Sequence, residues 1–218
     1  MDDLIELTGE IRDKCMCCRN SLSQEFDISE DSPPICAFNM VHNGATIALE
    51  LLVHYRSIWV KKYRSIWIKK RERSPKDISI AREENGQRVM EVTKWVFTAC
   101  LSSMEYSAKR ALKDWGDPLE MDWSRRVYLS GIVEKSVKEG WIKECVAAQM
   151  DDILFVRNCL VHNNGVSDKK RTLFNPSGGL FEADVDQMLQ SDLRLFLGYV
   201  LFACDYFQVW SRSMLSAR

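Results

Sequence analysis

LFLGYVLFAC, at residues 195–204, is the stretch that decides the fold. It carries no charged side chain, and a helix that is apolar on all sides is normally buried on all sides. The stretch therefore predicts a central helix, from about residue 184 to 214, surrounded by other elements. It is about half as long as a membrane-spanning helix needs to be, and Asp205 follows it, so we expect no membrane segment.

Around this core helix, apolar residues recur at helical spacing in further segments of the chain. They predict helices over residues 2–19, 45–73, 87–115, 122–138 and 141–163. Gly116-Asp117-Pro118 is expected to stop the third of these, and Asn164-Gly165 the fifth.

The segments between these helices carry turn residues. Residues 23–38 are acidic and contain Pro33-Pro34, which indicates a linker or a long loop, and residues 166–179 are expected to form an ordered loop. The sequence thus predicts an all-α fold, a bundle of about five to six helices with long antiparallel helices. We expect an N-terminal helix with a Pro-containing linker over 1–40 and a helical domain over 41–218.

Composition limits the classes of function. The chain has 218 residues, 46% of them hydrophobic, so it can bury a sizeable core. Its formal net charge is −1, so any binding of nucleic acid must come from a local patch. Eight cysteines and an acidic N-terminus without a signal-peptide pattern predict reduced thiols and a cytoplasmic location.

FVRNCLVHNNG, at residues 155–165, is the segment most informative about chemistry. Asn158 and His162 are four residues apart and share a helix face. Arg157 and His162 are five apart, or about 140° around a helix. Only the long side chain of Arg157, or a second copy of the helix across a dimer axis, would bring guanidinium and imidazole together.

These residue types match what RNA cleavage requires. A histidine can deprotonate the ribose 2′-hydroxyl or protonate the departing 5′-oxygen. An arginine can stabilise the charge that grows on phosphorus, and an asparagine can orient the imidazole or bind a phosphate oxygen. The helix C-terminus favours a general-acid role for His162, and no metal is required. The alternative is that His162 caps the helix and that Arg157 and Asn158 are ordinary surface residues.

Arg157-Asn158-x-x-x-His162 resembles the R-x(4–6)-H signature of the HEPN superfamily, helical bundles found in many ribonucleases. The resemblance implies that Arg157 and His162 are catalytic, that Asn158 assists, and that two copies form one composite cleft. It further implies an endoribonuclease of a toxin–antitoxin, phage-defence or RNA-processing system, with an antitoxin or defence-complex protein as partner. In one subgroup a tyrosine that a partner modifies lies two residues after the histidine, where this chain has Asn164. Other members are non-catalytic modules.

Two basic segments are candidates for RNA contact. YRSIWVKK at 55–62 is repeated as YRSIWIKK at 63–70, which places Lys61, Lys62, Lys69 and Lys70 among the aromatic residues Tyr55, Trp59, Tyr63 and Trp67. Cations can neutralise phosphates and aromatic faces can stack bases, although aromatic residues at helical spacing are also typical of a core. Lys169, Lys170 and Arg171 directly follow the motif and are better placed to hold a phosphate.

Other chemistry finds less support. Cys15-Met16-Cys17-Cys18 has no second ligand pair at zinc-binding spacing, so we predict thiols on an amphipathic helix and no metal or cofactor. Val41-His42-Asn43-Gly44 is interpreted as a capped turn. The leading hypothesis is a metal-independent endoribonuclease that acts as a homodimer on RNA. The alternative is a non-catalytic helical module that binds RNA or a partner protein.

Overall fold

The computed structural model describes residues 1–68, 75–163, 165–187 and 193–218, and within them the chain is mostly helical. Its helices are α1 (Asp2–Phe26), α2 (Pro33–Ile68), α3 (Pro75–Asp114), α4 (Leu129–Lys138), α5 (Glu144–His162) and α6 (Leu193–Ser216). A small antiparallel hairpin pairs β1 (Arg171–Phe174) with β2 (Leu180–Ala183), Arg171 opposite Ala183. The predicted bundle of long helices is confirmed.

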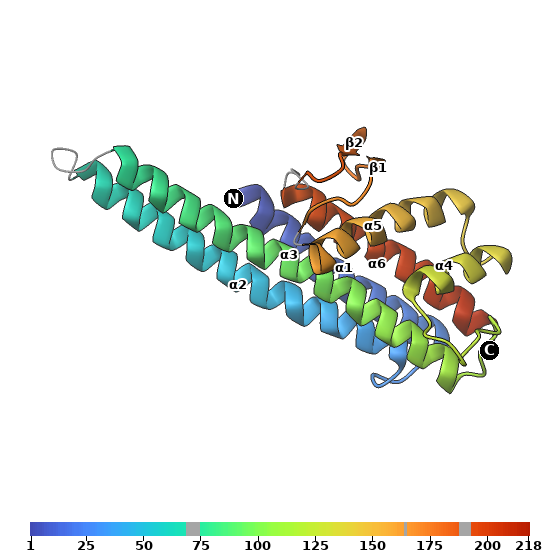
Figure 1. Ribbon diagram of the computed structural model, residues 1–218. Helices are drawn as coiled ribbons and strands as arrows, with labels where there is room; N and C mark the ends of the chain where they lie inside the picture. Colours follow the sequence, from blue (N-terminus) through green and yellow to red (C-terminus); the bar gives the residue numbers. More distant parts are fainter. Residues whose placement is uncertain (69–74, 164, 188–192) are drawn as a thin grey trace.

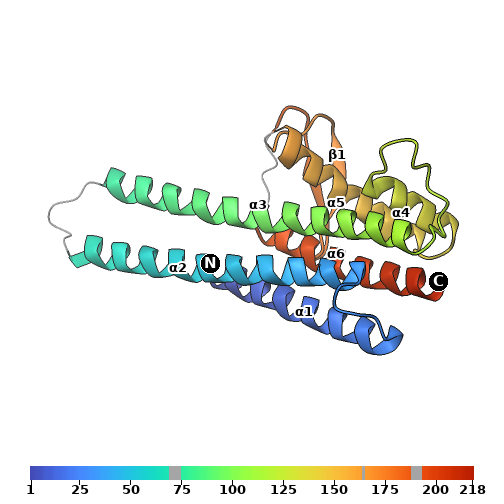
Figure 2. The same cartoon turned by 90° about the horizontal axis from the view of Figure 1, so that it is seen from below.

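Four long helices, α1, α2, α3 and α6, form the body of the fold (Figure 1). Helix α6 contacts α1 and α3, and its apolar stretch supplies fully buried side chains such as Tyr199 and Val200. The predicted buried helix is thus confirmed, but it begins at Leu193, and residues 184–187 of the predicted range are not helical. Helices α2 and α3 pack along each other and project beyond the other helices in both views (Figure 2).

Helix α1 belongs to the same core as the rest of the bundle. Ile11, Cys15 and Leu22 of α1 are buried in the hydrophobic cluster that α6 also enters. The expected division between residues 1–40 and 41–218 falls inside α2, which begins at Pro33.

Sequence predictions about the connecting segments were wrong in several places. The predicted linker at 23–38 is only residues 27–32, because Pro33 and Pro34 form the first turn of α2, where a missing N–H costs nothing. Val41–Gly44, interpreted as a capped turn, lies inside α2. The expected loop at 166–179 contains β1 and the turn of the hairpin, so the fold is not purely α.

Helix boundaries follow the predicted stop signals more closely. Helix α3 ends before Gly116, whose φ of 88° lets the Asp117 N–H bond the Leu112 carbonyl oxygen at 2.7 Å. Helix α3 nevertheless begins at Pro75, twelve residues before the predicted start at 87, and α4 begins at Leu129 where a start near 122 was expected.

Helix α2 is long and apolar enough over Pro33–Lys62 to cross a membrane by length and composition. Within the fold, 39% of the most apolar 18-residue segment of this helix is buried, and the helix packs against α1 and α3.

Candidate functional site

The second half of α5 lines a pocket of about 530 Å³ between α5, α3, the start of α4 and the segment that leads into β1. The walls bring together charged, polar and aromatic side chains from all of these elements. They include Glu105, Tyr128, Asp151, Arg157, Asn158, His162, Asp168, Lys169 and Arg171. The volume falls in the range of roughly 300–1,000 Å³ that is usual for small-ligand sites.

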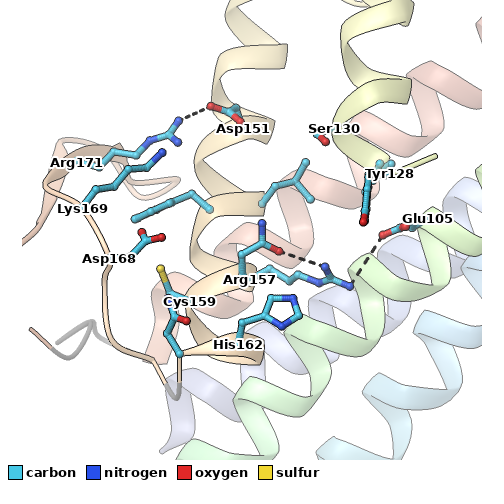
Figure 3. A pocket seen from close by; sticks show the side chains of 15 residues that line it. Glu105, Tyr128, Ser130, Asp151, Arg157, Cys159, His162, Asp168, Lys169 and Arg171 are labelled. Atoms are coloured by element: carbon cyan, nitrogen blue, oxygen red, sulfur yellow. Dashed lines mark hydrogen bonds and ion pairs between the residues drawn. The ribbon is translucent and has the colours of Figure 1, made fainter. Parts of the chain in front are cut away.

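Arg157 and His162 line the same pocket within one chain. Figure 3 shows the guanidinium and the imidazole on one side of α5, both directed toward α3. The long arginine side chain thus overcomes the angular separation of the two positions on the helix. Arg157 Nη1 donates to Asn158 Oδ1 at 3.2 Å, so the three motif residues share one wall.

Glu105 of α3 faces Arg157 across the pocket, and the sequence analysis did not identify it. Its Oε2 lies 3.9 Å from Arg157 Nη2, and its Oε1 pairs with Lys109 one turn further along α3. The Arg157 and Glu105 side chains are only 22% and 17% exposed, so solvent screens this ion pair less than a surface one. Arg157 Nε is buried and has no hydrogen-bond partner among the described residues.

His162 is the last residue of α5, and its side chain is exposed. The end of the helix is held by backbone bonds from Asn163 and Gly165 to the Cys159 carbonyl oxygen, at 3.0 and 2.9 Å. Gly165 has a φ of 86°, a left-handed conformation that glycine adopts without strain. Backbone groups thus satisfy the Cys159 carbonyl, and the imidazole is not needed as its cap.

The basic segment after the motif is divided between two environments. Lys169 Nζ lies 5.3 Å from the centre of the Phe155 ring and lines the pocket. Arg171 lines it too, but its guanidinium pairs with Asp151 and Asp152 at 2.6 and 2.7 Å. Lys170 pairs with Asp184 and does not line the pocket. Lys169 is thus the better candidate for a phosphate contact.

The hairpin that follows Lys169 and Lys170 is anchored through Phe174 of β1. Asp152 of α5 accepts from the Phe174 N–H at 3.0 Å, and the Tyr199 hydroxyl of α6 donates to the Phe174 carbonyl oxygen at 2.7 Å. Gly198 leaves room for Pro176, since a Cβ there would lie 3.3 Å from the proline ring. These contacts fix the position of the segment beside α5.

The lysines of the repeat at residues 55–70 that the structure describes, Lys61 and Lys62, lie away from this pocket. Lys62 pairs with Glu84 at 3.7 Å, and Glu84 is 21 residues from Glu105 along the continuous α3. At 1.5 Å per residue, this separates them by about 31 Å. Lys61 and Lys62 therefore lie on the projecting end of the α2–α3 pair, away from the pocket. Lys69 and Lys70, and the side chains of Tyr63 and Trp67, lie outside the described residues.

The cysteine cluster of α1 divides between core and surface. Cys15 and Cys18 are buried, and Cys15 Sγ lies 3.7 Å from Cys204 Sγ, whereas Cys17 is exposed. Burial raises the pKa of Cys18 to about 12. Among the described residues, no three His, Cys, Asp or Glu side chains are grouped so that they could hold a metal ion.

Comparison of the chain with protein-family models, with curated proteins and with solved structures finds no match.

Proposed function

We propose that the chain is a metal-independent endoribonuclease of the HEPN type, with Arg157 and His162 as its catalytic pair. One observation carries the proposal: the two side chains line one open pocket, and Asn158 is hydrogen-bonded to the arginine. Had they pointed into separate dry environments, a scaffold role would have been the better account.

The reaction we propose is an internal transfer at phosphorus. The ribose 2′-hydroxyl gives its proton to a base, and its oxygen attacks the adjacent phosphorus. The bond from phosphorus to the 5′-oxygen breaks, and that oxygen takes a proton from His162. The products are a 2′,3′-cyclic phosphate and a 5′-hydroxyl. In the homodimer that the family resemblance implies, the imidazole of a second copy is the matching base.

Arg157 is suited to stabilise the charge on phosphorus. A guanidinium has five N–H donors in a plane. Asn158 and Glu105 engage Nη1 and Nη2 of Arg157, and each of these nitrogens carries a second N–H. The guanidinium can therefore keep its protein partners while it donates to a phosphate oxygen.

A substrate with one ribonucleotide in a DNA strand tests this mechanism. We expect cutting only at the position that carries the 2′-hydroxyl, with a cyclic phosphate end, in the presence of EDTA. The His162→Ala variant should not cut, whereas His54→Ala should cut like wild type, because His54 is an exposed histidine on α2 outside the pocket. Equal cutting of an all-DNA strand would contradict the 2′-hydroxyl mechanism.

A second candidate function is a non-catalytic module that binds a partner protein. It is favoured by exposed apolar side chains on α2 and α3, with Met40, Ile47 and Trp95 each more than two-fifths exposed. Controlled expression in cells separates the two candidates. An unrestrained ribonuclease, which we place in the cytoplasm as a toxin or phage-defence effector, should arrest growth, and His162→Ala should not. A binding module should permit growth in both forms.

A further inference from the structure

Tyr128 gives the pocket an exposed aromatic surface. Two aromatic residues line the pocket, and Phe155 is buried while Tyr128 is 50% exposed. Figure 3 shows the Tyr128 side chain entering from the side of α4 and directed toward Glu105, opposite the wall that carries Lys169 and Arg171. Its ring is therefore open to a ligand that occupies the pocket.

The backbone and one arginine side chain restrict the position of the Tyr128 ring. Tyr128 precedes α4 as its N-cap, with an extended backbone, and its neighbours Val127 and Leu129 are buried. The guanidinium of Arg126 lies 5.2 Å from the centre of the ring. An aromatic side chain that is fixed in this way loses little conformational entropy when a planar ligand stacks on it.

Tyr128 also lies where the pocket meets a groove. This groove, of about 990 Å³, runs along α4 and shares Tyr128, Ser130 and Asp151 with the pocket. Its cations are largely matched by carboxylates: Arg125 lies 3.5 Å from Asp122, and Lys138 lies 2.7 Å from Glu134. Charge alone therefore gives the groove little attraction for a polyanion, and the aromatic ring is its distinctive feature.

We propose that Tyr128 is the stacking platform for one unpaired nucleobase of single-stranded RNA. The inference rests on the proposed ribonuclease function, because it places this base next to the phosphate that Arg157 holds. The strand would then run from the pocket across Tyr128 into the groove along α4. Exposed tyrosine rings backed by arginine bind bases in this manner, because every base has a flat π face. A base in a duplex cannot reach the ring.

Binding of an RNA that cannot be cut tests the platform separately from catalysis. The probe is a short single-stranded oligonucleotide with 2′-O-methyl groups and a fluorescent label, and the dissociation constant is read from anisotropy. Tyr128→Ala should weaken binding by between about 5-fold and about 150-fold, the range for loss of one stacked base. Tyr128→Phe should bind like wild type, and so should Tyr106→Ala, which removes an exposed tyrosine outside the pocket and the groove.

Two further binding measurements separate stacking from phosphate contacts. The loss caused by Tyr128→Ala should be the same at low and high salt, because no phosphate contact is removed. A probe with abasic positions should bind wild type more weakly, and Tyr128→Ala should lose nothing further. An equal abasic penalty in both proteins would overturn the platform.

The failures of the two proposals are distinguishable. If wild type cuts RNA while Tyr128→Ala binds the probe as tightly as wild type does, the platform is refuted and the ribonuclease stands. If wild type neither binds the single-stranded probe nor cuts RNA, both proposals are refuted. Thermal melting of each variant shows whether a loss of binding comes from a loss of fold.

Discussion

Glu105 on α3 and Arg157 on α5 form an ion pair across the wall of the pocket, with 3.9 Å between Oε2 and Nη2. Lys109 pairs with the other oxygen of the same carboxylate. The pair links two helices whose residues are about fifty positions apart in the sequence. It sets the direction of the guanidinium, so it connects the packing of α5 on α3 to the chemistry proposed for the site.

A double-mutant cycle measures the coupling free energy between Glu105 and Arg157. We expect Glu105→Gln and Arg157→Gln each to destabilise the fold, and the double variant to lose less than the sum. The coupling should be about 0.5–2 kcal/mol, because the two side chains are mostly buried but the contact is long. The measurement is urea unfolding of the four proteins.

The exposed pair Arg110–Asp114 is the matched control for this cycle, at 3.2 Å and four residues apart on one helix. Its coupling should be smaller, about 0.3–0.5 kcal/mol. No coupling between Glu105 and Arg157 would show that the ion pair does not hold the arginine.

Asp152 should control the order of the segment that carries Lys169. Its side chain is 15% exposed and accepts from both Arg171 Nε, at 2.9 Å, and the Phe174 N–H. In Asp152→Asn, an amide N–H faces one of these donors, and we expect a loss of about 1–3 kcal/mol in the free energy of unfolding. Hydrogen exchange in residues 171–183 should accelerate while helix content is unchanged.

Asp151→Asn is the control, because Asp151 is 64% exposed and pairs with the same arginine. This substitution should accelerate hydrogen exchange in residues 171–183 only slightly. Equal acceleration of exchange in the two variants would contradict the anchoring role of Asp152.

Cysteine alkylation should separate the surface thiols from the core thiols. Cys17 and Cys145 are exposed and should react first with iodoacetamide at pH 8. The hydrogen bond with Cys204, together with burial, raises the pKa of Cys15, and burial raises that of Cys18 to about 12, so their reactive thiolates are scarce at this pH.

Mass spectrometry of the alkylated peptides reads the result, and all eight cysteines should react after denaturation. Rapid labelling of Cys15 in the folded protein would mean that α1 does not pack on α6 as described.

The fold could be predicted from sequence where the pattern was long and local. The apolar stretch of α6 identified the buried helix, and Gly116 identified the end of α3, because both signals are local and act within about three helical turns. The pattern did not identify the start of α2, since Pro33-Pro34 is compatible with either a linker or a first helical turn. It also missed β1 and β2, because neither RTLF nor LFEA alternates apolar and polar residues.

The site could be predicted only where it is continuous in sequence. Arg157, Asn158, His162 and Lys169 lie within thirteen residues, and the structure brings them to one pocket. Glu105 and Tyr128 were missed because they come from α3 and the start of α4, and no local pattern sets them apart from other surface residues. Lys61 and Lys62 were assigned to RNA from their charge and from the aromatic residues near them in the sequence, and tertiary structure places them far from the pocket.

The most direct test of the account is RNA cleavage by purified protein with EDTA present, comparing wild type with His162→Ala and Arg157→Ala. We predict that wild type cuts single-stranded RNA and leaves 2′,3′-cyclic phosphate ends. Both variants should fold and should lose at least about 100-fold in rate, the usual contribution of one acid–base or charge-stabilising group. Cutting by His162→Ala at the wild-type rate would contradict the assignment of the site.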